Sequence, residues 1–277
     1  MKRVRDDDND SVKWPKIKGG LLDMLPNGTE CMRWTLAKGC CSLWWCPWPE
    51  ALEEPPLPAT QGYYRKLQIY GKLLEMPRRT WCYGYAYSFS GQTHPVDPET
   101  PPQITALYAW ANTACGVAPG DVGFNMDLCN HYPTGFHCIN AHSDDERQFG
   151  SLHDVICFVT GPAERELVIR DKHDKSVVLR GPLPSGVYCM AGRDFQTHYT
   201  HEFPRLHNGL FDKVLKSAPK WFGPERWPPG DVSNAHRAEW LAEHGDEVLA
   251  HLDPKQATKW HEWMQWRTSH TLRNFVE

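Results

Sequence analysis

The sequence predicts an α+β protein with a β-sandwich or jelly-roll core and flanking helices. The chain has 277 residues and is 40% hydrophobic and 12% aromatic, so it is able to bury a sizeable core. One amphipathic helical pattern precedes a series of short alternating segments, and two more helical patterns come before a last alternating segment. A helix followed by many short strands is typical of a sandwich or jelly roll with helices packed outside it.

Residues 1 to 60 are predicted to form a Trp- and Cys-rich extension, followed by the main domain at 61–277. The extension contains CCSLWWCPWP and ends in EEPPLPAT, a proline-rich stretch typical of a boundary. Zinc binding is an alternative for its cysteines, but their spacing fits no standard finger. These cysteines are Cys31, Cys40, Cys41 and Cys46.

The composition and the apolar stretches of the sequence limit the possible compartment and partners of the protein. The start, MKRVRDDDNDSVK, has no apolar core for a secretory signal, and the scattered cysteines favour reduced thiols. No apolar stretch approaches the roughly 18 residues that cross a bilayer. We therefore expect an intracellular protein, nuclear or cytoplasmic, with no membrane partner. A formal charge of −4 argues against a protein that binds nucleic acid over most of its surface. It is compatible with a local basic groove.

Residues 101 to 116 are predicted to form the first helix. The segment opens with prolines and ends in Gly116. Apolar residues recur between these ends at helical spacing, at Ile104, Leu107, Tyr108 and Ala111.

The pattern changes to strict alternation from Val122, which predicts a strand. One predicted face holds Phe124, Met126, Leu128, Asn130 and Tyr132, and the other holds Asn125, Asp127, Cys129 and His131. Short strands are expected next in HDVICFVT, RELVIR, SVVLR, GVYCMAG and DFQTHYTH, with turn residues between them.

The last quarter of the chain is predicted to be irregular at first and then helical. Residues 206 to about 230 are proline-rich and read as irregular. AHRAEWLAEHGDEVLAHL and DPKQATKWHEWMQW then show helical patterns, the second with Asp253 as N-cap and Pro254 at the first helical position. The alternating segment RTSHTLRNF follows.

The pair His142-x-Asp144 is a candidate for part of a metal site. If the segment is extended, both side chains point to the same side and can bind one ion. Non-haem iron(II) oxygenases combine two histidines with one carboxylate, so a second histidine must come from another strand. His201 is favoured over His198 for this position. The alternative is that these histidines are surface or hydrogen-bonded core residues.

Two further pairs at even spacing suggest a site for a small dicarboxylate. Asn130 and Tyr132 lie on one predicted face and can hydrogen-bond an anion beside the metal. Arg267 and Arg273 lie six residues apart, so on a strand both guanidinium groups enter the same cavity. Buried arginines need anions, which either a dicarboxylate or protein carboxylates can supply.

With these residues identified, the chain resembles the AlkB-like 2-oxoglutarate and iron(II)-dependent dioxygenases, in their nucleic-acid demethylase branch. The similarity covers about 65 to 205 and 264 to the end. It lies in PRRTWCYGYAYSFSG, FNMDLCNHYPTGFHCINAHSDDERQFG, THYTHEFPR and RTSHTLRNF. The resemblance implies a double-stranded β-helix core, with the segment at about 206–264 as a helical insert before the last core strand.

The resemblance also implies the chemistry. It places the iron(II) ligands on His142, Asp144 and His201. The 2-oxoglutarate contacts fall on Asn130, Tyr132, Arg267 and Arg273. With O2, such an enzyme oxidises N-methyl groups of bases, releasing formaldehyde, succinate and CO2.

A base in single-stranded or flipped-out nucleic acid is the implied substrate, DNA or RNA. We expect Tyr87 to stack on the base, Asp145 and Glu146 to favour cationic lesions of the 1-methyladenine and 3-methylcytosine type, and Arg79 to touch phosphate. Arg78 is a further candidate for phosphate. The alternative for each is a core tyrosine or a solvated charge. We expect a monomer.

The sequence departs from the family pattern in its last third. The segment 202–266 separates His201 from Arg267, and we interpret it as an inserted helical element. If this interpretation is wrong, the nearby Arg205 is an alternative arginine for the cosubstrate. His270 and Leu272 replace the usual Leu and Phe, on a face expected to point outward. The same segment contains Trp260, Trp263 and Trp266. These tryptophans either line a path for nucleic acid or pack within a helix.

Two other functions remain open. One is the same iron chemistry on a protein or small molecule. The other is a catalytically silent nucleic-acid or interaction module, against which the complete set of candidate ligands argues.

Overall fold

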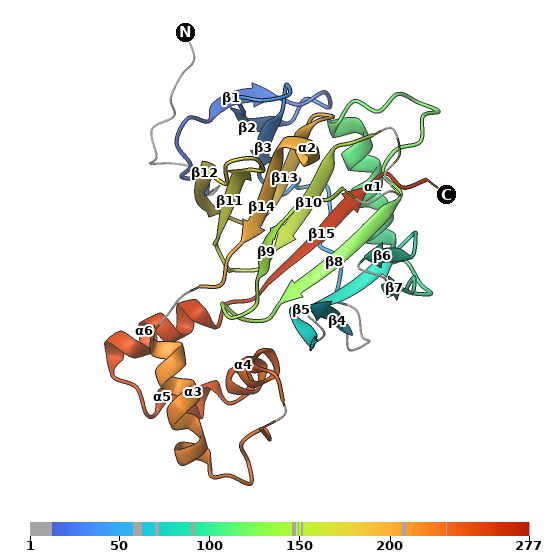
Figure 1. The fold of residues 1–277 in the computed structure, drawn as a ribbon. Helices are drawn as coiled ribbons and strands as arrows, with labels where there is room; N and C mark the ends of the chain where they lie inside the picture. The colour runs from blue at the N-terminus through green and yellow to red at the C-terminus, as the bar shows by residue number, and fades with distance from the viewer. Residues whose placement is uncertain are drawn as a thin grey trace.

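The computed structural model describes residues 13–57, 63–69, 72–89, 92–145, 148, 150, 152–206, 209–230 and 232–276. These residues form a nine-stranded sheet, a four-stranded sheet and a two-stranded ribbon, and every printed strand pairing is antiparallel. Helices flank the sheets (Figure 1). This mixed architecture confirms the predicted fold class in its broad form and is consistent with a jelly roll.

The nine-stranded sheet runs in the order β1-β2-β3-β13-β10-β15-β8-β5-β4. Its strands are β1 (Leu21–Met24), β2 (Glu30–Thr35), β3 (Ser42–Cys46), β4 (Tyr63–Ile69), β5 (Lys72–Tyr83), β8 (Met126–Tyr132), β10 (Val155–Thr160), β13 (Gly186–Ala191) and β15 (Arg267–Arg273). The C-terminal β15 lies between β10 and β8 in the middle of this sheet.

The four-stranded sheet runs in the order β12-β11-β14-β9. Its strands are β9 (Ile139–His142), β11 (Arg165–Asp171), β12 (Val177–Leu183) and β14 (Tyr199–Phe203). An inner core fills the space between the two sheets; Val155, Cys157 and Met190 belong to the large sheet, and Leu167 and Ile169 to the small one. The ribbon consists of β6 (Tyr87–Phe89) and β7 (Gln92–His94).

An outer core lies between the large sheet and α1 (Pro102–Ala114), which covers its other face. Ile104, Leu107 and Ala111 are fully buried there, which confirms the predicted helix. The alternation predicted for β8 is confirmed from Met126 onward, since Leu128 lines the inner side and Cys129 belongs to the outer core. Both faces of β8 are therefore buried. The predicted alternation was wrong for Phe124, which precedes the strand and lies in the outer core.

The first strands of the chain extend the large sheet. β3 pairs with β13 from Val187↔Cys46 to Ala191↔Ser42, and β2 and β1 continue the sheet beyond it. Residues 21–46 are thus part of the main sheet and not separate from it. The boundary at residue 60 stays a prediction.

The segment between β14 and β15 contains α3 (Gly209–Phe222), α4 (Asn234–Glu243), α5 (Gly245–Leu249) and α6 (Pro254–Trp263). They gather in a helical lobe at one end of the sheets (Figure 1). The capping of α6 by Asp253 is as predicted. The irregular reading of 206–230 was wrong for α3, which buries Leu210, Val214 and Ala218 at helical spacing despite Pro219.

The predicted strand DFQTHYTH is divided in the structure. Phe195–His198 form the short helix α2, and only from Tyr199 does the chain become β14. His198 therefore ends a helix, whereas His201 lies within a strand. Among the described residues, no helix is long and apolar enough to span a membrane.

Candidate metal and cosubstrate site

Paired strands of the small sheet bring the two favoured histidines together. His142 ends β9 and is the direct partner of His201 in β14, and their ring centroids lie 4.2 Å apart. Asp144 follows two residues after His142. One ligand atom from each of these three residues lies within 4.8 Å of the others, so the structure brings the predicted triad together. His198 is not part of this group.

The ligand atoms face one another. His142 Nε2 lies 3.6 Å from Asp144 Oδ1, and His201 Nε2 lies 3.8 Å from Asp144 Oδ2. His142 Nδ1 lies 2.8 Å from the carbonyl oxygen of Asn140, which fixes that nitrogen as the donor. The lone pair of His142 is therefore on Nε2, on the side of the carboxylate. Such a second hydrogen bond commonly orients a ligating imidazole.

Electrostatics hold all three groups in the protonation states that a metal requires. Burial raises the pKa of Asp144, but Arg273 and the two imidazoles outweigh it and lower that pKa to about 2. Burial and the neighbouring His142 lower the pKa of His201 to about 3, and burial also lowers that of His142. At neutral pH the site offers a carboxylate and two neutral imidazoles.

A cavity of about 210 Å³ opens beside the triad, between the two sheets. Asn130 and Tyr132 of β8 line it, as the alternation of that strand predicted. Ser269, Thr271 and Arg273 line it from β15. The cavity thus places polar side chains of the large sheet opposite the candidate metal ligands of the small sheet.

The two predicted arginines lie on the same face of β15 but at different depths. Arg273 Nη2 donates to Asp144 Oδ1 at 2.6 Å, at the triad itself. Arg267 is 2% exposed, opposite Tyr132 in the strand register, with its guanidinium carbon 4.2 Å from the centroid of the Phe203 ring. It lies just outside the residues that line the cavity. Among the described residues no carboxylate lies within ion-pair distance of Arg267.

Arg78 also lines the cavity, which the sequence had suggested only as a phosphate contact. It is 5% exposed, and its Nε donates to Asn130 Oδ1 at 2.9 Å. Alternation along β5 explains this position, since Met76 lines the cavity as well and Thr80 also contacts Asn130. The sequence did not predict a role for Gln196, whose Oε1 accepts a hydrogen bond from the backbone N–H of Asp144 at 2.9 Å. No sequence pattern indicates that a glutamine will orient a metal ligand in this way.

The predicted substrate contacts are only partly brought together. Tyr87 lines the cavity and its ring lies 5.3 Å from the Arg273 guanidinium carbon. Asp145 points elsewhere, toward Lys172 Nζ at 3.1 Å. Arg79 faces the helical lobe and pairs with Glu239 at 2.6 Å. Glu146 lies outside the described residues.

Packing bears on the alternatives drawn from the segment between His201 and Arg267. Arg205 lies with its guanidinium carbon 3.7 Å from the centroid of the Phe136 ring and does not line the cavity. Trp260 and Trp263 are each 1% exposed within the helical lobe, and only Trp266 is exposed, at 38%. Packing therefore accounts for two of the three tryptophans. Among the described residues, the cysteines of the first 60 residues form no metal-ligand group.

The fold and the His/Asp/His site are consistent with an AlkB-like dioxygenase, and the sequence comparisons support this class. Three curated relatives named DNA oxidative demethylase ALKBH2 match over 163 residues, which is 55% of this chain. The protein from Homo sapiens is 33% identical and covered over 60% of its length. Those from Mus musculus and Bos taurus are 31% and 29% identical, covered over 65% and 56%. The chain thus spans less than two thirds of each relative. No protein-family model matches it.

Proposed function

We propose that this chain is an iron(II)- and 2-oxoglutarate-dependent oxidative demethylase of N-alkylated bases in nucleic acid. The convergence of His142, Asp144 and His201 beside Arg273 is the observation that carries the proposal. Similarity to proteins named as DNA oxidative demethylases favours DNA as the substrate. The 1-methyladenine and 3-methylcytosine type of lesion is the preferred class, because these bases carry a positive charge.

The residues present fit an iron(II) ion. Two imidazoles and one carboxylate match the donor set of non-haem iron oxygenases, which leaves positions open for cosubstrate and oxygen. Among the described residues the buried Asp144 Oδ2 has no hydrogen-bond partner, so it is available to a cation. His142 Nε2, His201 Nε2 and an Asp144 oxygen would hold the metal.

The residues also fit 2-oxoglutarate. Arg273 would bind the carboxylate nearer the metal, and Arg267 the distal one, while Asn130 and Tyr132 donate hydrogen bonds between them. The buried Nη2 of Arg267 has no partner among the described residues, which suits an anion at that end. When bound, iron and 2-oxoglutarate supply the oxidation by O2 that turns an N-methyl group into a hydroxymethyl group, lost as formaldehyde, with succinate and CO2 as coproducts.

The substrate base would enter the cavity past Tyr87. A base within a duplex cannot reach this depth, so the enzyme acts on single strands or on a nucleotide rotated out of the stack. The Tyr87 ring offers a stacking face for such a base. Asp145 is held by Lys172 and is a poor sensor of the cationic base, which leaves Glu146 for that role.

Three further features belong to the same proposal. The helical lobe is proposed as an insert at about 206–264 in an AlkB-like core of double-stranded β-helix type. A DNA substrate favours a nuclear location. The enzyme is proposed to act as a monomer, because the triad and both arginines come from one chain.

The test is a demethylation assay on methylated single-stranded DNA and RNA oligonucleotides with iron(II), 2-oxoglutarate and ascorbate. We expect loss of one CH2 unit by mass spectrometry and release of formaldehyde. Asp144→Ala should lower the rate by more than about 100-fold, because it removes a metal ligand. Asp145→Ala is the matched control and should leave the rate within about threefold.

The alternatives give different results in the same assay. Turnover of 2-oxoglutarate without demethylation of any oligonucleotide would indicate a protein or small-molecule substrate. Binding of oligonucleotides without 2-oxoglutarate turnover would indicate a catalytically silent module. Either result would reject the proposal.

A further inference from the structure

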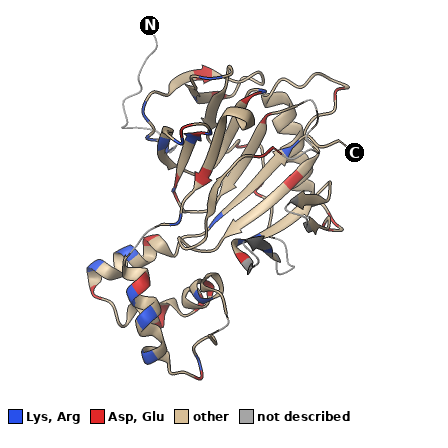
Figure 2. Cartoon of the chain, in the orientation of Figure 1, with Lys and Arg blue, Asp and Glu red and all other residues tan. Residues whose placement is uncertain are grey.

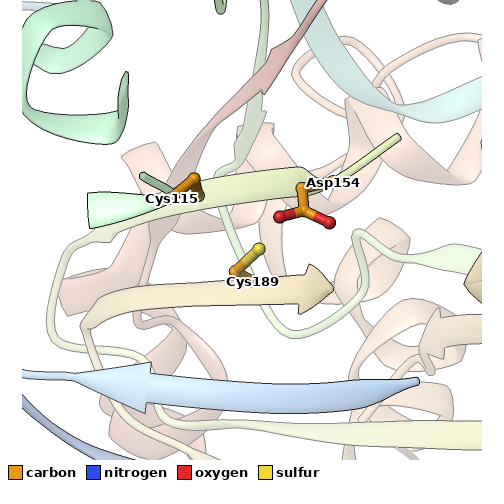
Figure 3. Close-up of side chains that lie close together, drawn as sticks. All are labelled: Cys115, Asp154 and Cys189. Carbon is orange, nitrogen blue, oxygen red and sulfur yellow. The ribbon is translucent and has the colours of Figure 1, made fainter. Parts of the chain in front are cut away.

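A second group of potential metal ligands lies on the outer side of the large sheet. Cys115 caps the C-terminal end of α1, Asp154 comes immediately before β10, and Cys189 lies in β13. One ligand atom of each lies within 4.8 Å of the others. Figure 3 shows the three side chains meeting between these elements. The spacing of these residues in the sequence does not predict the group, because its members are far apart in the chain.

The surroundings of the group favour a cation. Cys189 is fully buried, while Cys115 and Asp154 are half-buried. Among the described residues, no Lys, Arg or His side chain lies within ion-pair distance of Asp154. The backbone N–H of Gly192 donates to Asp154 Oδ1 at 2.8 Å and so fixes the direction of the carboxylate. His153 and Arg33 lower the pKa of Asp154 from a distance, but burial outweighs them. A half-buried carboxylate without a cation in direct contact is costly, and a metal ion would offset that cost.

We propose that Cys115, Asp154 and Cys189 form a binding site for a soft divalent cation of the zinc type, separate from the His142 site. Two thiolates and one carboxylate are a preferred donor set for Zn²⁺, and the fourth tetrahedral position is left to solvent. At Zn–S distances of about 2.3 Å, two thiolates lie about 3.8 Å apart. Because the ligand atoms lie within 4.8 Å of one another, the two sulfurs have to approach by at most about 1 Å.

Binding follows a simple proton balance. Burial raises the pKa of both Cys189 and Asp154. The thiol protons of Cys115 and Cys189 pass to solvent as their sulfurs bond to the ion. The ion would then join the end of α1 to β13 and to the start of β10, which are elements that share the outer core. Its role is structural, since it is on the far side of the sheet from the cavity.

Cobalt(II) distinguishes this site from the first one. A cobalt ion bound by thiolates gives a sulfur-to-metal charge-transfer band in the near ultraviolet, whereas a His/Asp/His site has no sulfur and gives none. The experiment titrates cobalt(II) into the full chain, stripped of metal and kept reduced, in an Asp144→Ala background that removes the first site. We expect the band to appear at one cobalt per chain and to disappear when Zn²⁺ is added.

Matched variants locate the ligands. Cys115→Ser and Cys189→Ser should abolish the band, and Asp154→Asn should weaken cobalt binding by about tenfold or more while keeping the acceptor for Gly192. Cys46→Ser is the control, since Cys46 is equally buried in the neighbouring strand β3 but is outside the group. It should keep the band.

The outcomes against the proposal are distinct from those against the demethylase. Absence of the band in the folded chain, or its survival in Cys189→Ser, would overturn the second site. A disulfide between Cys115 and Cys189 under reducing conditions would do the same. Demethylase activity enters none of these readouts.

Discussion

Arg267 is a buried cation, and no carboxylate of the described residues lies within ion-pair distance of it. Its Nη1 donates to the carbonyl oxygen of Leu183 at 3.4 Å, and its guanidinium group packs on the Phe203 ring. Burial lowers its pKa. A group in this position is stabilised by an anion that arrives from outside the chain. The distal carboxylate of 2-oxoglutarate has the required charge.

Replacement of Arg267 therefore tests the cosubstrate assignment. Arg267→Ala removes charge-assisted hydrogen bonds worth about 1.5–3 kcal/mol, so we expect KM for 2-oxoglutarate to rise about 10- to 150-fold. Arg267→Lys should recover only part of the loss, because lysine lacks the planar fork. The measurements are KM and the calorimetric Kd for 2-oxoglutarate without O2.

Arg205→Ala is the control for this prediction and decides the remaining alternative. Arg205 stacks on Phe136 away from the cavity, so its removal should leave KM unchanged. A large rise in KM for Arg205→Ala with none for Arg267→Ala would exchange the two assignments.

At the scale of the element, β15 and β8 share a buried ion pair on their outer face. His270 Nδ1 lies 2.8 Å from Asp127 Oδ2, and the two residues are 2% and 0% exposed. His270 lies on the outward face of the sheet, as expected, and α1 covers that face. A family position usually occupied by leucine thus carries half of a polar pair.

A double-mutant cycle tests this pair. His270→Leu alone leaves a buried carboxylate without its partner and should lower the free energy of unfolding by about 3–5 kcal/mol. The double variant Asp127→Leu/His270→Leu should lie much closer to the wild type, since apolar side chains suit that core. Chemical denaturation at neutral pH provides the measurement. Equal losses in the single and double variants would contradict a specific pair.

The same pair predicts a pH dependence. Burial alone would lower the pKa of His270, but contacts with Cys129 and Asp127 raise it well above 6.5. A raised folded-state pKa stabilises the fold fully below about pH 6.5 and less as the pH rises through the folded value. Above about pH 6.5 the free energy of unfolding of the wild type should therefore fall relative to that of the double variant. A difference between the two free energies that stays constant with pH would contradict this prediction.

The helix α3 shows why an element can differ from what the sequence predicts. Leu210, Val214, Ala218 and Phe222 recur at helical spacing, but Pro219 and the following prolines outweighed that pattern. Pro219 lies in the last turn, where the interrupted hydrogen bonds are few. α2 escaped for a different reason, because four residues carry too little periodicity to be seen.

At the scale of the molecule, polar contacts tie the helical lobe to the sheet, among them one between His236 of α4 and Glu75 of β5 at 3.2 Å. Glu239 of α4 accepts hydrogen bonds from the Tyr64 hydroxyl of β4 and from Arg79 of β5, the latter at 2.6 Å. Because β5 also carries Arg78 into the cavity, the lobe supports one wall of the site. Figure 2 shows basic positions in blue on the helices of the lobe. The sequence of α3 contributes Lys213, Lys216 and Lys220.

Removal of the Glu239 contacts should loosen the lobe and β5 together. Glu239→Ala should cost about 2 kcal/mol of unfolding free energy, a figure reduced because Arg79 is 30% exposed. Hydrogen exchange should speed up in both α4 and β5. Glu243→Ala, exposed on the same helix, is the control and should change neither. Faster exchange confined to α4 would show that the lobe does not support β5.

The sequence alone determined the broad fold class, the first helix, the face of β8 and the choice of triad residues. These follow from local rules, since alternation and helical spacing decide which side chains share a face. It also ranked His201 above His198. Substrate contacts did less well. Arg79 follows Arg78 in β5 and so faces away from the cavity. Asp145 lies in a loop, where alternation does not determine the direction of a side chain.

The tertiary structure decided which separate faces meet. The pairing of β14 with β9 set His201 against His142, and the stacking of α1 buried His270 and brought Cys115 to Asp154 and Cys189. Such contacts join residues tens of positions apart, and no local periodicity encodes them. They arise from the packing of whole elements, where burial and strand register fix each neighbour.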